Sequence, residues 1–223
     1  MKLSNHIKYA IDDVLAGKPD AGLLHACIAI DATSKRLFPK TRQVGPRYVN
    51  CIRRYYWLIE PMLGGGIDLE QTLFANVPLE KAKTPDFADL IYEIFRCSHA
   101  HGDDIPAQFS LIPTRGQFNS AWELGANELH MPDRVVWALL GVTVFSEVNA
   151  KERTNSEHYL SLGTEIFRIS EWWGREKDFR PIADRYNQVR VRMESLGQLL
   201  DTPKKEGGEI ANLFILNPPQ SGS

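Results

Sequence analysis

The chain has 223 residues, of which 43% are hydrophobic and 24% are charged, and these are ordinary values for a globular protein with a buried core. The formal net charge of −2 at pH 7 argues against a protein that binds polyanions over its whole surface, so any nucleic-acid site has to be local. The three cysteines, Cys27, Cys51 and Cys97, are an odd number without a repeating spacing, which excludes a disulfide framework and a zinc signature.

Helices are predicted for the first third of the chain. A first helix begins at Ser4 or Asn5 and is stopped by 17–19, where glycine and proline occur together. A second helix runs from Asp20 to about Leu37. A third helix begins at Pro46 and continues to Met62, where three consecutive glycines end it.

A fourth helix is predicted after a connector that spans about 68–84. It opens at Pro85 and Asp86 and ends at Gly102. Its apolar residues recur at helical spacing, which predicts one buried face; they are Phe87, Leu90, Ile91, Ile94 and Phe95.

The second half combines strand and helix signals. A short strand is predicted at 109–112, between two prolines, and the segment from there to His130 is ambiguous. A fifth helix begins near Pro132 and is apolar on nearly every face, so we expect it at the centre of the fold. Residues 159–169 alternate loosely and are predicted to pair with 109–112 in a small sheet. A last amphipathic segment covers about Ile182 to Leu200.

These elements predict a mostly α fold, a helical bundle with a small accessory β element. We expect one domain over 1–201, with a bundle core at about 4–148 and a C-terminal extension at about 149–201. The tail over 202–223 is rich in glycine, proline and serine, so we expect it to be partly mobile.

The clearest indication of chemistry is at the end of the predicted fourth helix. Arg96 is followed, five positions later, by His101 and then by Gly102. Arginine is a permanent cation that can hold a phosphate group, and histidine exchanges a proton most easily near neutral pH. Together they predict a site that cleaves phosphodiesters.

This arrangement of an arginine, four residues and a histidine resembles the motif of the HEPN domains, the helical nucleotide-binding domains of higher eukaryotes and prokaryotes. The resemblance implies a helical bundle in which two protomers bring their motifs together at a dimer interface and cleave RNA without a metal. It assigns proton transfer to His101 and stabilisation of the phosphate charge to Arg96.

His99 is a second candidate for the working imidazole. A step of five residues rotates by about 140° around an ideal helix, whereas a step of three keeps two side chains on neighbouring positions. His99 is therefore closer to Arg96 on a regular helix than His101 is. The alternative interpretation is that all three cations complement the dipole of the helix C-terminus.

A basic stretch extends from Ala32 to Ile59, in which no acidic residue occurs. Aromatic residues alternate with its cations, and such a surface can hold phosphates and stack bases. The alternative is a solvated positive face with the aromatic rings in the core, which we favour for the rings. The residues predicted to bind RNA are Lys35, Arg36, Arg42, Arg53 and Arg54.

Asp31 lies in an otherwise apolar helical run, where a buried carboxylate needs a partner. Pairing with Arg96 across the bundle is one solution, and an exposed position on the helix is the other, which we favour. The remaining histidines, His6, His25, His130 and His158, are scattered, and no spacing indicates a metal site. We therefore expect neither a metal nor another cofactor.

The leading hypothesis is a homodimeric HEPN-like protein that acts on or binds RNA, as a metal-independent endoribonuclease of toxin or defence type. One alternative is a non-catalytic helical scaffold for dimerisation or partner binding. Another is a domain that binds a small molecule or nucleotide. The polar N-terminus and an apolar run too short to span a bilayer, 135–148, predict a cytoplasmic protein without a membrane contact.

Overall fold

The computed structural model describes residues 2–64, 66–77, 79–80, 82–96, 106, 108–114, 122–187 and 190–191. Among these residues 54% are helical and 14% lie in strands, and the strands form three small sheets. The prediction of a mostly α bundle was therefore wrong, because the fold is a mixed α/β one. The helical patterns are local in sequence, whereas two of the strand pairs, 66–67 with 190–191 and 109–112 with 128–132, join segments that no short pattern connects.

Two long helices open the chain and pack against each other. Helix α1 spans Leu3–Leu15 and α2 spans Pro19–Leu37, so both predicted helices are confirmed within two residues. Gly22 permits their close approach, because a side chain there would meet the carbonyl oxygen of Ala10 at 2.9 Å. The buried faces of the pair join the main core.

The predicted third helix is divided in two. Helix α3 spans Val44–Arg54 and α4 spans Tyr56–Met62. The backbone at Tyr55 leaves helical geometry, with φ −108° and ψ 17°. The hydroxyl group of Tyr55 lies 2.7 Å from Ser146 Oγ and donates to Glu176 Oε2 at 2.7 Å, so tertiary contacts fix the residue at which the helix is interrupted.

The predicted fourth helix exists but is not a regular α-helix. Helix α5, Phe87–Leu90, begins with a capping box in which Asp86 and Asp89 each accept from the other's backbone N–H. It continues directly as a π-helix, η1, Ile91–Arg96. The expected end at Gly102, together with Cys97, His99 and His101, lies outside the described residues.

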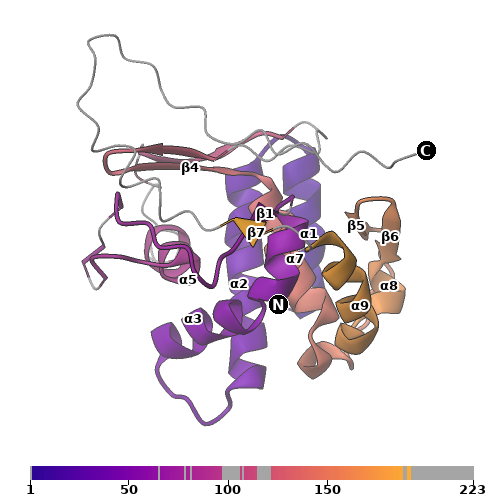
Figure 1. Ribbon diagram of the computed structural model, residues 1–223. Helices are drawn as coiled ribbons and strands as arrows, with labels where there is room; N and C mark the ends of the chain where they lie inside the picture. The colour runs from indigo at the N-terminus through magenta and orange to yellow at the C-terminus, as the bar shows by residue number, and fades with distance from the viewer. Residues whose placement is uncertain are drawn as a thin grey trace.

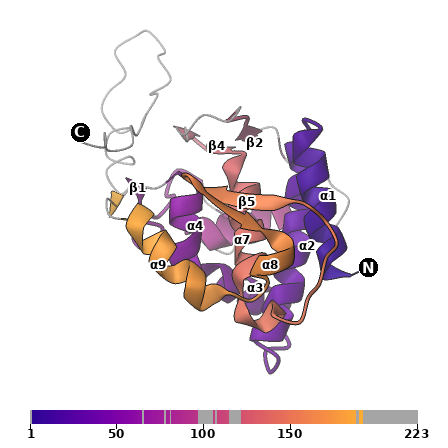
Figure 2. The ribbon, with the colours of Figure 1, turned by 90° about the vertical axis from the view of Figure 1, so that its right-hand side faces the viewer.

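Helix α7, Arg134–Phe145, is the centre of the molecule, as predicted. Ten of its twelve residues are buried, and it contacts α2 on one side and α4 on another. Figure 2 shows it between α4 and the α1–α2 pair. It has little exposed surface because nearly every position is apolar.

The largest sheet has three strands and lies at one end of the helices (Figure 1). Strand β2, Phe109–Ile112, is parallel to β4, Glu128–Pro132, which is antiparallel to β3, Glu123–Gly125. Strand β2 confirms the predicted strand at 109–112, and β4 ends directly before α7. The sheet therefore positions the first turn of the central helix.

Residues 159–168 form a hairpin of their own, so their predicted pairing with 109–112 was wrong. Strands β5, Tyr159–Leu162, and β6, Glu165–Arg168, are antiparallel and are joined at Gly163, whose φ of +58° favours glycine. A sequential hairpin requires no long loop to close, whereas pairing with 109–112 does. Strand β1, Gly66–Ile67, is parallel to β7, Arg190–Val191.

The C-terminal extension packs against α7. It contains the 3-10 turn η2, Glu147–Asn149, helix α8, Ile169–Trp172, and helix α9, Glu176–Tyr186. The phenyl rings of Phe145 and Phe179 stack with their centroids 3.9 Å apart, and Phe167 meets both edge-on. The amphipathic segment predicted at 182–200 begins earlier, with α9 at Glu176. Residues 192–201 and the predicted tail at 202–223 lie outside the described residues.

None of the helices in the described part of the chain has the length and apolarity needed to cross a bilayer.

Candidate functional site

Arg96, the arginine of the predicted motif, is engaged in an ion-pair network. Its Nη2 atom lies 3.4 Å from Asp31 Oδ2 of α2, and its guanidinium lies over the ring of Tyr92. Arg47 of α3 holds the other oxygen of the same carboxylate, at 2.9 Å. Asp31 is half-buried, so the favoured interpretation of an exposed position was wrong and the pairing with Arg96 is the one observed.

Two cations thus converge on one carboxylate where α2, α3 and η1 meet. Only 12% of the Arg47 side chain is exposed, and its Nε atom is buried without a hydrogen-bond partner among the described residues. The network joins three elements of the fold. It therefore gives Arg96 a structural role, whatever else the residue does.

The basic stretch is partly neutralised by acidic residues from other segments. Arg53 donates to Asp86 at 2.6 Å and to Asp89 at 3.0 Å. Arg36 pairs with Glu152 at 2.7 Å. These partners are remote in sequence, so the absence of acidic residues between Ala32 and Ile59 does not produce a uniformly positive surface.

The remaining predicted RNA-binding residues, Lys35, Arg42 and Arg54, are exposed. Of the aromatic rings of this stretch, Trp57 is only partly buried, whereas Tyr48, Tyr55 and Tyr56 belong to the core, as favoured, and are at most 3% exposed. They are not available to stack bases.

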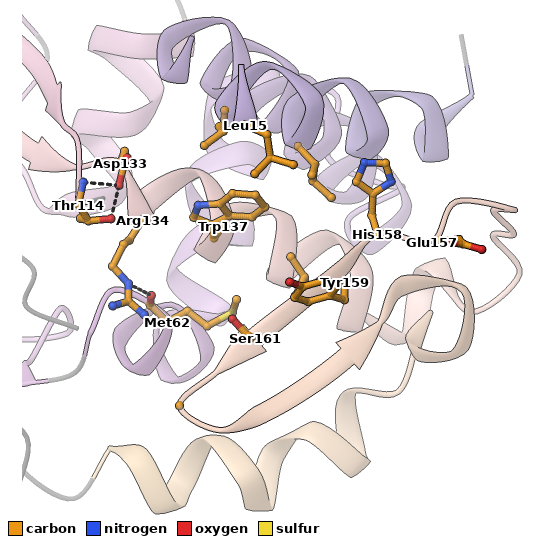
Figure 3. A pocket seen from close by; sticks show the side chains of 14 residues that line it. Leu15, Met62, Thr114, Asp133, Arg134, Trp137, Glu157, His158, Tyr159 and Ser161 are labelled. Atoms are coloured by element: carbon orange, nitrogen blue, oxygen red, sulfur yellow. Dashed lines mark hydrogen bonds between the residues drawn. The ribbon is translucent and has the colours of Figure 1, made fainter. Parts of the chain in front are cut away.

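A cleft that sequence analysis did not identify lies between α1, the start of α7 and the β5–β6 hairpin. Its volume is about 770 Å³, within the range of pockets that hold small molecules. Figure 3 shows Trp137 in its middle, between Leu15 of α1 and Tyr159 of β5. The residues that line it are Ile11, Val14, Leu15, Met62, Thr114, Asp133, Arg134, Trp137, Glu157, His158, Tyr159, Leu160, Ser161 and Gly163.

Large apolar groups are exposed in this cleft. Leu15 is 73% exposed and Tyr159 is 56% exposed, and the indole ring of Trp137 is only partly buried. Apolar surface in contact with water costs about 25 cal/mol per Å². A ligand that covers these side chains therefore gains affinity from their dehydration.

Charged residues occupy the end of the cleft at the first turn of α7. Arg134 donates from Nε to the Met62 carbonyl oxygen at 3.3 Å, which orients its guanidinium. Burial lowers the pKa of Arg134, and the neighbouring Asp133 opposes this change. An arginine nevertheless stays protonated at neutral pH, so the cleft contains a partly desolvated cation.

The carboxylate of Asp133 is already hydrogen-bonded. Its Oδ1 atom accepts from the Thr114 N–H at 3.2 Å and from Thr114 Oγ1 at 2.7 Å (Figure 3). These bonds tie the end of β2 to the start of α7. They also fix the position of the Asp133 carboxylate beside Thr114.

His158 lies at the other end of the cleft and joins two of its walls. Its Nε2 atom lies 2.9 Å from Asp12 Oδ1 of α1, and its Nδ1 atom is hydrogen-bonded to Ser156 Oγ. The pKa of Asp12 is lowered, first by the hydrogen bond from Lys8 and also by that from His158. The interaction attaches the segment before β5 to helix α1.

A serine, a histidine and an aspartate in series are also the residue types of a nucleophilic triad. Ser156, however, is not one of the described residues that line the cleft, and its Oγ atom accepts from the His158 N–H at 3.1 Å. Nucleophilic attack on a ligand in the cleft is not supported by this placement. The contacts among Ser156, His158 and Asp12 instead stabilise the wall of the cleft.

Sequence signals for the cleft were weak. Asp133 and Arg134 form a charged pair at the start of an otherwise apolar helix, and this could have drawn attention to them. Asp12 and His158 are 146 positions apart, and no sequence pattern connects them. In the described part of the chain no three histidine, cysteine, aspartate or glutamate side chains are grouped as metal ligands are.

The chain is similar to a family of mycobacterial proteins. The model of the Rv1289 family matches residues 2–198. "Uncharacterized protein Rv1289" of Mycobacterium tuberculosis and "Uncharacterized protein Mb1320" of Mycobacterium bovis are each 32% identical over 168 residues, which cover 74% of this chain and 80% of the relative. No solved structure matches the chain. The chain belongs to the Rv1289 family.

Proposed function

We propose that this member of the Rv1289 family binds a small amphipathic anion in the cleft between α1, α7 and the β5–β6 hairpin. The ligand has an apolar, preferably aromatic body and one negatively charged group. The sequence analysis gave a domain that binds a small molecule as one alternative, and the proposal now names the residues that would bind it. We further expect the protein to work in the cytoplasm, where its buried thiols Cys27 and Cys51 stay reduced.

The observation that carries the proposal is the placement of Arg134 and Trp137 in one cleft. They are three residues apart on α7, a spacing that puts two side chains on neighbouring positions of a helix. The indole ring offers a flat apolar surface, and the guanidinium offers a charge that water only partly solvates. An aromatic anion can contact both groups at once.

The ribonuclease hypothesis remains a second prediction. Arg96 is near one other cation, Arg47, which is compatible with phosphate binding, but both already pair with Asp31. The cleft is favoured because its aromatic ring and its cation line a space of ligand size.

The test uses the fluorescent anion 8-anilino-1-naphthalenesulfonate as the probe. We expect saturable binding, weakened about tenfold by Trp137→Ala, since tryptophan is enriched among the few residues whose truncation at a binding surface costs more than about 1 kcal/mol. Tyr9→Ser is the matched control, because Tyr9 is an exposed aromatic residue of α1 that does not line the cleft. Equal affinity in wild type and Trp137→Ala, with both proteins folded, would contradict the proposal.

The charge preference is tested separately with 2-naphthoate and its uncharged amide as competitors. Wild type should bind the carboxylate about tenfold more tightly, a difference of about 1.4 kcal/mol. Arg134→Met retains an apolar stem and should abolish the difference. If the variant keeps the preference for the carboxylate, Arg134 is not the group that recognises the charge.

A further inference from the structure

A second hollow, of about 420 Å³, lies at the start of helix α1. It is lined by Lys2, Leu3, Arg36, Lys151, Glu152 and Arg153. Four of these six side chains are cationic and one is anionic, in a protein whose net charge is −2. The hollow is therefore a local concentration of positive charge that the overall composition does not predict.

The guanidinium of Arg36 is held in place by the fold. Its Nη1 atom donates to Asn149 Oδ1 and its Nη2 atom donates to Glu152 Oε1, both at 2.7 Å. Asn149 is fully buried and itself donates to Thr33 Oγ1 at 3.0 Å and to the Thr143 carbonyl oxygen at 2.8 Å. The position of Arg36 thus depends on buried polar contacts between α2 and the residues that follow α7.

Arg153 is also held without a ligand. Its Nη1 atom donates to the carbonyl oxygens of Ala150 at 2.9 Å and of Glu152 at 2.6 Å. Its Nε and Nη2 atoms have no hydrogen-bond partner among the described residues. A guanidinium that is already fixed loses less conformational entropy when it binds an anion than a mobile one does.

Two lysines complete the positive charge. Lys2 and Lys151 are exposed and form no ion pair within the described part of the chain. The carboxylate of Glu152 compensates one of the four positive charges, through its contact with Arg36. About three positive charges remain around the hollow, more than a single carboxylate ligand would neutralise.

We propose that this hollow binds a phosphate-bearing anion. Arginine presents several N–H donors in a planar fork that matches phosphate oxygens, and lysine adds a compact charge with three donors. The proposal is independent of the cleft, which shares none of these residues. The sequence analysis grouped Arg36 with Arg53 and Arg54 in one RNA-binding stretch. In the hollow, Arg36 instead acts together with Lys2, Lys151 and Arg153.

The test is isothermal titration calorimetry with tripolyphosphate at constant ionic strength. We expect saturable binding that the double substitution Lys151→Gln with Arg153→Gln weakens at least tenfold. Arg36 is left unchanged, because its contacts with Asn149 and Glu152 support the fold. Circular dichroism and the melting temperature should match those of the wild type.

The control is Lys18→Gln with Arg168→Gln, which removes the same two charges from exposed positions outside the hollow. We expect its affinity for tripolyphosphate to change less than twofold. An equal loss in both double variants would indicate general charge attraction and overturn the site. The absence of saturable binding to folded wild-type protein would overturn it as well.

A second titration distinguishes a small phosphate compound from the backbone of RNA as the source of the phosphate. A fluorescent 12-nucleotide oligouridylate is titrated with the same proteins, and tripolyphosphate is then added as a competitor. Binding that the Lys151/Arg153 variant loses and that tripolyphosphate displaces identifies RNA as a ligand of the hollow. If tripolyphosphate binds and the oligonucleotide does not compete, the ligand is a small phosphate compound.

Discussion

At the scale of single residues, Arg96 has one observed contact and one predicted role, and experiments can separate them. As a partner of Asp31 it contributes to the network that joins α2, α3 and η1. As the arginine of the motif that resembles HEPN domains it would clamp a phosphate, together with His99 or His101. Arg47 shares Asp31 but not the motif, so it is the natural control.

We predict that Arg96→Ala lowers the free energy of unfolding by about 1 kcal/mol, since Asp31 keeps Arg47 as a partner and half-exposed ion pairs contribute little. If the ribonuclease hypothesis is right, this variant also loses RNA cleavage, whereas Arg47→Ala retains it and EDTA has no effect. Urea unfolding and cleavage of a labelled RNA are the two measurements. Equal cleavage by both variants, or a protein that light scattering finds monomeric, would count against a shared HEPN-like site.

At the scale of secondary-structure elements, the contact between α1 and α2 contains a histidine pair. The Nδ1 atoms of His6 and His25 lie 3.1 Å apart, so one imidazole donates and the other accepts. Only 8% of His6 is exposed. Its burial, and then the proximity of His25, lower the pKa of His6 below its usual range.

We predict that the free energy of unfolding decreases as the pH falls below about 6.5, the usual pKa of histidine. In that range the unfolded chain binds a proton at His6 that the folded chain does not, so the unfolded state is favoured. His6→Gln keeps a polar partner for His25 without a titrating group, and should flatten the dependence between pH 7 and 5. Urea unfolding at several pH values measures this, with His130→Gln as the control. An unchanged slope in His6→Gln would assign the dependence to other groups.

The sequence predicted the helices better than the strands, for a physical reason. Helices α1, α2 and α7 have apolar residues that repeat within the element, so their patterns are visible locally. The break at Tyr55 was not predictable, because the partners that hold its hydroxyl group lie at Ser146 and Glu176. The pairing of β2 with β4 likewise depends on contacts between separate segments.

The same distinction applies to the candidate sites. Arg96 and the basic stretch were visible because their residues are neighbours in sequence. The cleft and the hollow each combine residues from both halves of the chain, and the fold alone brings them together. The partners of Arg36 and Arg53 were missed for the same reason, since Glu152 and Asp86 are contributed by other segments.

At the scale of the whole molecule, the aromatic contacts between Phe145, Phe167 and Phe179 join α7 to the C-terminal extension. Tyr55 adds a polar link from the break between α3 and α4 to Glu176 of α9. The extension therefore shares its core with the helices. We therefore keep the expectation that the N-terminal helices and the extension fold as one unit.

We predict a single unfolding transition in urea that circular dichroism and tryptophan fluorescence report alike. Phe145→Ala should lower the free energy of unfolding by about 3–5 kcal/mol, because it removes a fully buried ring and leaves a cavity. Ile166→Ala, on the exposed face of the hairpin, should change it by less than about 0.5 kcal/mol. A second transition, or one that only a single probe detects, would divide the molecule into separately folding parts.

Side-chain caps are scarce in this fold. Among the helices of the described residues, α5 alone has a capping box, and no side chain caps the N-terminus of α1, α2, α3, α4, α7, α8 or α9. Helices without such local stabilisation form mainly when their apolar faces are covered. Since α7 covers α2 and α4, the core of the N-terminal helices stays incomplete until residues 134–145 have been synthesised. During translation, we therefore expect the first 130 residues to leave the ribosome with part of their apolar surface still in contact with water, until α7 follows and covers it.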